Sequence, residues 1–271
     1  MTRDLEPDTG LEPDTGLEPG TDLEPGTGRI PFGRLLRAET RKLFDTRSSM
    51  IMTGLMAVLA LALVAGRAAV LTEPPKLFTL AGSAAIALGI LLPVLAVLTV
   101  TAEWSHRTAL TTFTLEPRRA RVLAAKCLPP LGAAVVTCLF ALAVAVPATA
   151  VAAAVRGVDA SWHVTPQTVL GWIAVMVLMT AQGLAMGLLL LNAPAAIVIC
   201  LAGTALWSFV AQLGGAGETL AAWLDLNTTT GPLMGGTWTG EAAAHLATSV
   251  LAWIVIPGGL GILRVVRKDV S

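Results

Sequence analysis

A run of charged residues between two apolar stretches is the part of this sequence best suited to specific contacts. Residues 103 to 126, EWSHRTALTTFTLEPRRARVLAAK, carry five bases and two acids. Ser105 is placed to cap a short helix, and Pro117 is placed as the first residue of the next one. The segment is longer than the roughly 2 to 8 residues that join antiparallel helices, which favours a helical hairpin that docks on a protein. Contact with anionic lipid headgroups is the alternative.

The histidine, serine and glycine residues of this sequence do not form a recognised catalytic or metal-binding motif. His106, His163 and His245 lie on different sides or at different depths of the membrane topology that the apolar runs predict, so they cannot converge on one metal. The sequence has no G-x-S-x-G turn and no G-x-x-x-x-G-K-[ST] phosphate loop. We therefore expect no catalytic residue, metal or cofactor on this chain, and any ATP that drives it is hydrolysed by a partner.

The composition is that of an integral membrane protein. Of the 271 residues, 55% are apolar and 13% are charged, whereas about a quarter of a soluble domain is charged. Residues 1 to 28 hold eight acids and one base, within four hexapeptides such as LEPDTG, and we expect this tail to be disordered. The bases elsewhere are scattered rather than interleaved with aromatic residues, which argues against nucleic acid as a partner.

Residues 29 to 48 have the pattern of an amphipathic helix, with apolar residues on one face and bases opposite. The apolar face holds Phe32, Leu35, Leu36 and Leu43, and the bases are Arg34, Arg37 and Arg41. Because an apolar run follows at once, we expect this helix to lie in the membrane interface. The alternative is a helix packed on soluble protein.

Six apolar runs follow, each close to the roughly 20 residues that a helix needs to cross a bilayer. They lie near residues 49 to 71, 77 to 102, 128 to 154, 169 to 191, 195 to 212 and 243 to 263. The sequence thus predicts an all-α integral membrane protein whose residues 49 to 271 form a six-span domain. The tail and first helix together hold seven Lys and Arg, the 103 to 127 loop five and the carboxy terminus three, whereas the outer loops hold only three. This bias places both termini in the cytoplasm.

The interior of the predicted spans lacks Asp, Glu, Lys and His near the bilayer centre, which disfavours a carrier driven by an ion gradient. Hydroxyl groups such as those of Thr99 and Thr180 are expected to bond between helices. Gly183 and Gly187 form a G-x-x-x-G pair that permits close helix approach and is weak evidence for a dimer seam. Residues 213 to 242 form a long outer segment that we expect to cap or re-enter the membrane around a short helix.

Two stretches of this sequence resemble the type-2 ATP-binding-cassette (ABC) exporter permeases of actinobacteria. RLLRAETRKLFDTRSS, residues 34 to 49, resembles the first helix of that family. Residues 103 to 126 resemble its pattern of an acid, a Thr, a Pro-Arg-Arg step and Ala-Ala-Lys. Arg107 stands where the family commonly has Gly, and the hexapeptide tail has no counterpart.

The resemblance implies a permease subunit in a bacterial plasma membrane, with an ATPase subunit resting on the hairpin and the first helix. It assigns a coupling surface to Glu103, Arg107, Thr108, Pro117, Arg118, Arg119 and Lys126. A second permease chain, identical or homologous, would complete the translocation path, and lipids, drugs or apolar peptides are equally acceptable substrates. A membrane scaffold or sensor that holds soluble partners without transport is the alternative from another class.

Overall fold

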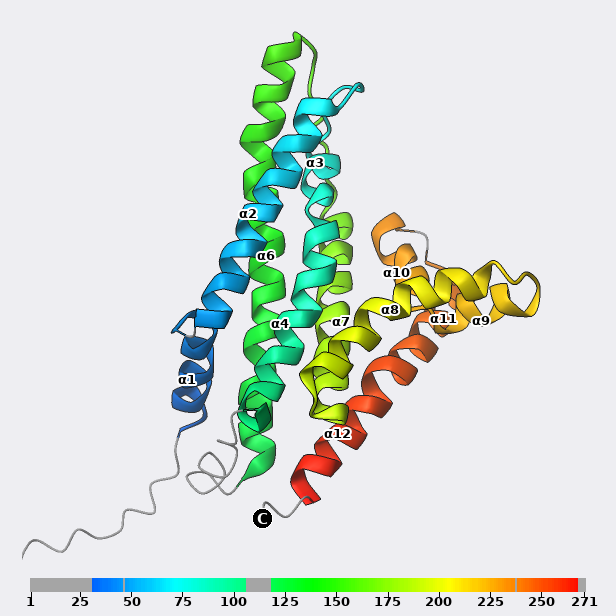
Figure 1. Cartoon of the computed structure of the whole chain (residues 1–271). Helices are drawn as coiled ribbons and strands as arrows, with labels where there is room; N and C mark the ends of the chain where they lie inside the picture. Colours follow the sequence, from blue (N-terminus) through cyan, green and yellow to red (C-terminus); the bar gives the residue numbers. More distant parts are fainter. Residues whose placement is uncertain (1–30, 46, 106–117, 237, 268–271) are drawn as a thin grey trace, which may run out of the picture. The chain divides into compact units, whose positions relative to one another are not determined.

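The computed structural model describes residues 31–45, 47–105, 118–236 and 238–267. These residues are helical, and their one strand-like contact is a parallel bridge between Lys76 and Ser161. Figure 1 shows the helices, all of which belong to the unit Pro31–Ser271. The acidic tail predicted for residues 1 to 28 lies outside the described residues.

The helices follow one another with short connections. In chain order they are α1 (Phe32–Asp45), α2 (Arg47–Val70), α3 (Leu77–Ser83), α4 (Ala85–Ser105), α6 (Arg119–Arg156), α7 (Pro166–Leu190), α8 (Ala193–Ala211), α9 (Ala216–Leu224), α10 (Leu226–Gly235), α11 (Gly240–Val250), the π-helix η1 (Leu251–Val255) and α12 (Ile256–Arg267).

Six of these segments are long and apolar enough to cross a membrane, which confirms the six predicted spans. They are Met50–Val70, Ala85–Ala102, Arg119–Arg156, Pro166–Leu190, Ala193–Ala211 and Gly240–Arg267. The second predicted run is not one helix, because α3 ends at Ser83 and α4 begins at Ala85. The Ser83 hydroxyl donates to the Leu80 carbonyl at 2.6 Å, a local bond that competes with the regular helical ladder.

α7 lies at the centre of the packing, because it contacts α4, α6, α8, α10 and α12. Its contact with α4 depends on Gly183 and Gly187. A Cβ atom at Gly183 would overlap the backbone of Pro93, and one at Gly187 would overlap the Val100 side chain. The G-x-x-x-G face is therefore occupied by a helix of the same chain.

The hydroxyl groups of Thr99 and Thr180 bond within their own helices, contrary to the expected bonds between helices. Thr99 donates to the Leu95 carbonyl at 2.8 Å, and Thr180 donates to the Met176 carbonyl at 2.7 Å. In a dry interior this is the nearest acceptor, four residues back on the same helix.

The connection between α7 and α8 is a tight turn. Leu191 adopts a positive φ of 50°, and the Asn192 side chain accepts a hydrogen bond from the Ala195 N–H at 3.1 Å. Pro194 occupies the first turn of α8, where its missing N–H leaves no helical bond unmade.

The segment between the fifth and sixth spans folds into two helices, where the sequence predicts one short helix. α9 and α10 are separated by Asp225, which caps α10. The last span then widens into η1 before Pro257. Proline lacks an N–H and its ring crowds the carbonyl four residues earlier, which accounts for the altered turn at this position.

Candidate functional site

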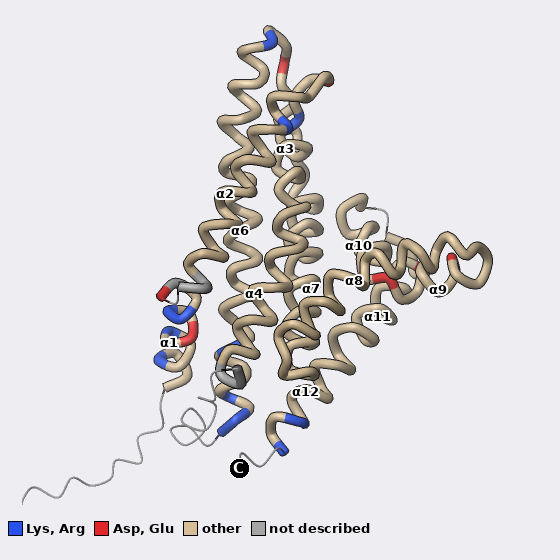
Figure 2. Tube along the Cα trace, viewed as in Figure 1, with Lys and Arg blue, Asp and Glu red and all other residues tan. Residues whose placement is uncertain are grey.

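Basic residues gather where α1, the start of α6 and the end of α12 lie (Figure 2). Among the residues whose side chains the structure describes, this group comprises Arg34, Arg37, Arg41, Lys42, Arg118, Arg119, Arg121, Lys126, Arg264 and Arg267. The opposite ends of the helices carry Arg67, Lys76 and Arg156. We call the first group the basic end.

A buried ion pair joins α1 to α6 at the basic end. The Lys126 Nζ lies 3.1 Å from the Glu39 Oε2, and the two residues are only 4% and 3% exposed. The other carboxylate oxygen, Oε1, lies 2.5 Å from the Lys42 Nζ. Both oxygens of Glu39 are thus bound to ammonium groups, which compensates the charge that burial would otherwise make costly.

Lys126 therefore lies inside the protein, although the resemblance assigned it to a surface that contacts an ATPase. Its contact is with Glu39, a residue for which sequence analysis predicted no role. The signal was nevertheless present, because Glu39 falls four residues from both Leu35 and Leu43 on the apolar face of the first helix. An acid within an apolar stripe needs a buried partner.

Two arginines attach α12 to its neighbours. The Arg119 Nη1 donates to the carbonyls of Val265 and Val266 at 3.1 and 3.0 Å. The Arg264 Nη1 donates to the Leu189 carbonyl, near the end of α7, at 2.6 Å. Carbonyls in the last turn of a helix have no partner within it and carry partial negative charge, so a guanidinium is a suitable cap.

The remaining predicted residues are exposed or fall outside the described part of the chain. Arg34, Arg37, Arg41 and Arg118 are exposed. Glu103 belongs to α4, but its side chain is not among those described. Arg107, Thr108 and Pro117 lie outside the described residues, and α6 begins at Arg119. The basic end thus consists of a buried, bonded part and an exposed part.

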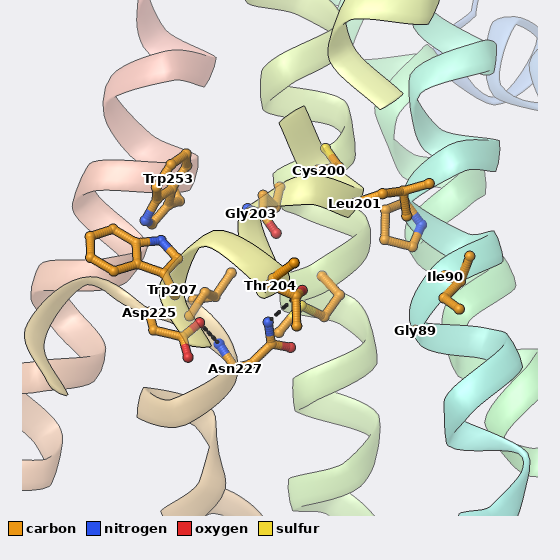
Figure 3. A pocket seen from close by; sticks show the side chains of 15 residues that line it. Gly89, Ile90, Cys200, Leu201, Gly203, Thr204, Trp207, Asp225, Asn227 and Trp253 are labelled. Atoms are coloured by element: carbon orange, nitrogen blue, oxygen red, sulfur yellow. Dashed lines mark hydrogen bonds between the residues drawn. The ribbon is translucent and has the colours of Figure 1, made fainter. Parts of the chain in front are cut away.

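A second candidate site is a pocket of about 450 Å³ formed by α4, α7, α8, η1 and the start of α10. Figure 3 shows it from close by. Its walls include Ile90 and Pro93 of α4, Gln182 of α7 and Trp207 of α8. Of the described residues that line it, Asp225 alone carries a formal charge. We call this cavity the Asp225 pocket.

Asp225 is 8% exposed and holds the first turn of α10. Its Oδ1 accepts from the Asn227 N–H at 3.1 Å, and its Oδ2 accepts from the Thr228 N–H and hydroxyl at 3.3 and 2.6 Å. The Asn227 side chain in turn donates to the Thr204 hydroxyl of α8 at 3.0 Å (Figure 3). This chain of bonds connects α10 to α8 across the pocket.

Two tryptophans form adjoining walls of the Asp225 pocket. The rings of Trp207 and Trp253 are perpendicular, with centroids 6.4 Å apart. The Trp253 Nε1 donates to the Leu224 carbonyl at 2.7 Å. The Trp207 Nε1 is buried and has no hydrogen-bond acceptor among the described residues. Sequence analysis missed the pocket, because its residues come from five separate segments.

The fold and these sites define a class: the chain is a multi-pass helical membrane protein. No protein-family model matches its sequence, and no curated protein matches it either. Among the described residues no three His, Cys, Asp or Glu side chains come together as metal ligands.

Proposed function

We propose that the chain is the permease subunit of an ABC exporter in a bacterial plasma membrane, coupled to a separate ATPase subunit. The observation that carries the proposal is the bonding at the basic end. The start of α6 is held to α1 through Lys126 and Glu39 and to α12 through Arg119. A displacement of the segment before α6 would thus move α6, α1 and α12 together.

The charge distribution supports a cytoplasmic basic end. Loops and helix ends on the cytoplasmic side of membrane proteins are enriched in Lys and Arg. Ten described bases lie at the basic end against three at the opposite ends. With six spans, this orientation puts both termini in the cytoplasm, on the side where ATP is available. In that orientation α1, with Arg34, Arg37 and Arg41 exposed, would lie at the inner membrane surface.

The sequence supports a division of labour between two polypeptides. It has no phosphate loop, so the chain depends on a partner for ATP hydrolysis. The likeness of residues 34 to 49 and 103 to 126 to type-2 exporter permeases indicates where such a partner would rest. The Asp225 pocket supports transport rather than a scaffold, because a scaffold needs no cavity among its spans. In this proposal a second permease chain completes the path.

The test first asks whether a neighbouring reading frame encodes an ATPase with a phosphate loop, and then reconstitutes that ATPase with this chain in proteoliposomes. We expect the chain to bind the ATPase and to change its rate of ATP hydrolysis. Arg118→Glu should weaken both effects, because Arg118 is exposed at the start of α6. Arg67→Glu is the matched control, since Arg67 is exposed at the opposite end of the helices.

Equal binding and equal stimulation by the two variants would refute docking at the basic end. A chain that never binds or stimulates the ATPase would refute the exporter itself, and the scaffold or sensor would then be the better description.

A further inference from the structure

We propose that the Asp225 pocket binds an organic ammonium ion with apolar substituents. The inference deepens the proposed function, because it names the chemical class of molecule that the permease would carry. It depends on three properties of the pocket: an uncompensated carboxylate, two aromatic walls, and a size and lining that suit a small amphiphilic molecule.

The carboxylate is the first property. Among the described residues, the Asp225 carboxylate accepts three hydrogen bonds, all from neutral donors in α10. Among the described residues no Lys, Arg or His forms an ion pair with it, in contrast to Glu39, which binds two ammonium groups. A carboxylate has about four lone-pair positions, so one remains for a ligand.

Capping alone does not require this charge. Asn and Ser cap helices about as well as Asp, and the same chain uses Asn192 to cap α8 and Thr239 to cap α11. An acid that is 8% exposed and faces an apolar cavity costs free energy that a neutral cap would avoid. A cationic ligand would recover that cost.

The aromatic walls are the second property. Trp207 and Trp253 stand at right angles on the same side of the pocket as Asp225, whereas Gly89, Ile90 and Leu201 lie across from them (Figure 3). Indole is the aromatic side chain that attracts cations most strongly, and quaternary ammonium ligands are typically held between such rings. A cation seated here would meet indole and carboxylate together.

Size and lining are the third property. A volume of about 450 Å³ falls within the roughly 300 to 1,000 Å³ of small-molecule sites. Ile90, Met179 and Leu201 provide apolar surface for the substituents, and few polar groups are available to orient the charge.

The test measures binding of radiolabelled phenyltrimethylammonium to the full chain in lipid nanodiscs, with empty nanodiscs as the blank. tert-Butylbenzene has the same shape with carbon in place of the charged nitrogen. We expect saturable binding of the cation and no displacement by the neutral compound. This comparison uses the unaltered protein, so it does not depend on whether any variant folds.

The variant Asp225→Asn keeps a capping oxygen and removes the charge. We expect it to bind the cation at least about tenfold more weakly, because the attraction between opposite charges in contact is lost where the effective dielectric constant is near 20. Asp159→Asn is the matched control, because Asp159 is exposed and does not line the pocket. Trp207→Leu should weaken binding by about threefold or more.

Absence of saturable binding at millimolar cation would overturn the proposal, as would equal displacement by tert-butylbenzene. Equal affinity of the Asp225→Asn and Asp159→Asn variants would also overturn it. The measurement involves no ATPase, so a chain that binds the cation but never couples to an ATPase would refute the exporter and leave the pocket standing. A chain that couples to an ATPase but binds no cation would refute the proposed cation site and leave the exporter standing.

Discussion

Removing the ammonium group of Lys126 should release α1 from α6. Lys126→Met keeps most of the side-chain volume but leaves Glu39, which is 3% exposed, with one of its two cationic partners. Breaking a buried ion pair by removing one partner costs about 3 to 5 kcal/mol. Lys42 continues to bind the other oxygen, so we expect a value near the lower limit, about 3 kcal/mol.

Hydrogen exchange measures this change where it occurs. Opening of α1 that costs about 3 kcal/mol less should speed exchange of its backbone amides by roughly a hundredfold, since about 1.4 kcal/mol corresponds to a factor of ten. The core of α7, with Trp172 fully buried, should exchange as before. Arg41→Met is the matched control, because Arg41 is exposed on the same helix and should leave exchange unchanged.

A double variant tests whether the effect belongs to the pair. Glu39→Leu with Lys126→Met replaces both charges by apolar groups, and such replacements are often neutral or stabilising. We expect α1 to exchange nearly as slowly as in the unaltered protein, which gives a coupling free energy of about 2 to 3 kcal/mol. Unchanged exchange in Lys126→Met, or a double variant as fast as that single variant, would refute the assignment of this ion pair as the attachment of α1.

Three further predictions concern packing and capping. Gly183→Ala should lower the free energy of unfolding by about 1 to 3 kcal/mol, because its Cβ would overlap the backbone of α4. Gly203→Ala, where a Cβ has open space, should leave the free energy of unfolding unchanged. Thermal unfolding in detergent compares the two variants. Arg119→Met should speed amide exchange in the last turn of α12 by removing two carbonyl contacts, and Arg267→Met, which alters an exposed residue of the same turn, should have little effect. Asp225→Ala should destabilise the protein by about 1 kcal/mol through loss of the α10 cap, and equal thermal stability with Asp225→Asn would contradict that role.

The spans could be predicted from the sequence because each depends on a local property, a run of apolar residues of sufficient length. The turn at Asn192 was predictable for the same reason, since a capping residue and a proline are adjacent there. The break before Ala85 was not, because it lies inside a continuous apolar run. Hydropathy does not register the local bond that the Ser83 hydroxyl makes there.

The contacts in the two candidate sites join residues that are distant in the sequence, so the sequence alone could not predict most of them. Glu39 and Lys126 are far apart in the chain, and each alone resembles an ordinary charged residue near a membrane surface. Asp225 lies in the segment 213 to 242, for which the sequence predicted only a long outer segment around a short helix. Its importance follows from the tryptophans of two other helices, which no local pattern connects to it.

The length of α6 has a consequence of its own. Its 38 residues span about 57 Å at 1.5 Å per residue, nearly twice the roughly 30 Å thickness of the hydrocarbon layer. Both ends of α6 must therefore extend beyond the hydrocarbon layer. Arg156 donates hydrogen bonds to carbonyls at the end of α2 on one side, and Arg119 donates to carbonyls at the end of α12 on the other. A rotation of α6 by about 5° around its midpoint would displace each of its ends by roughly 2.5 Å. A small displacement of α6 on one side of the bilayer would therefore be transmitted to the other side.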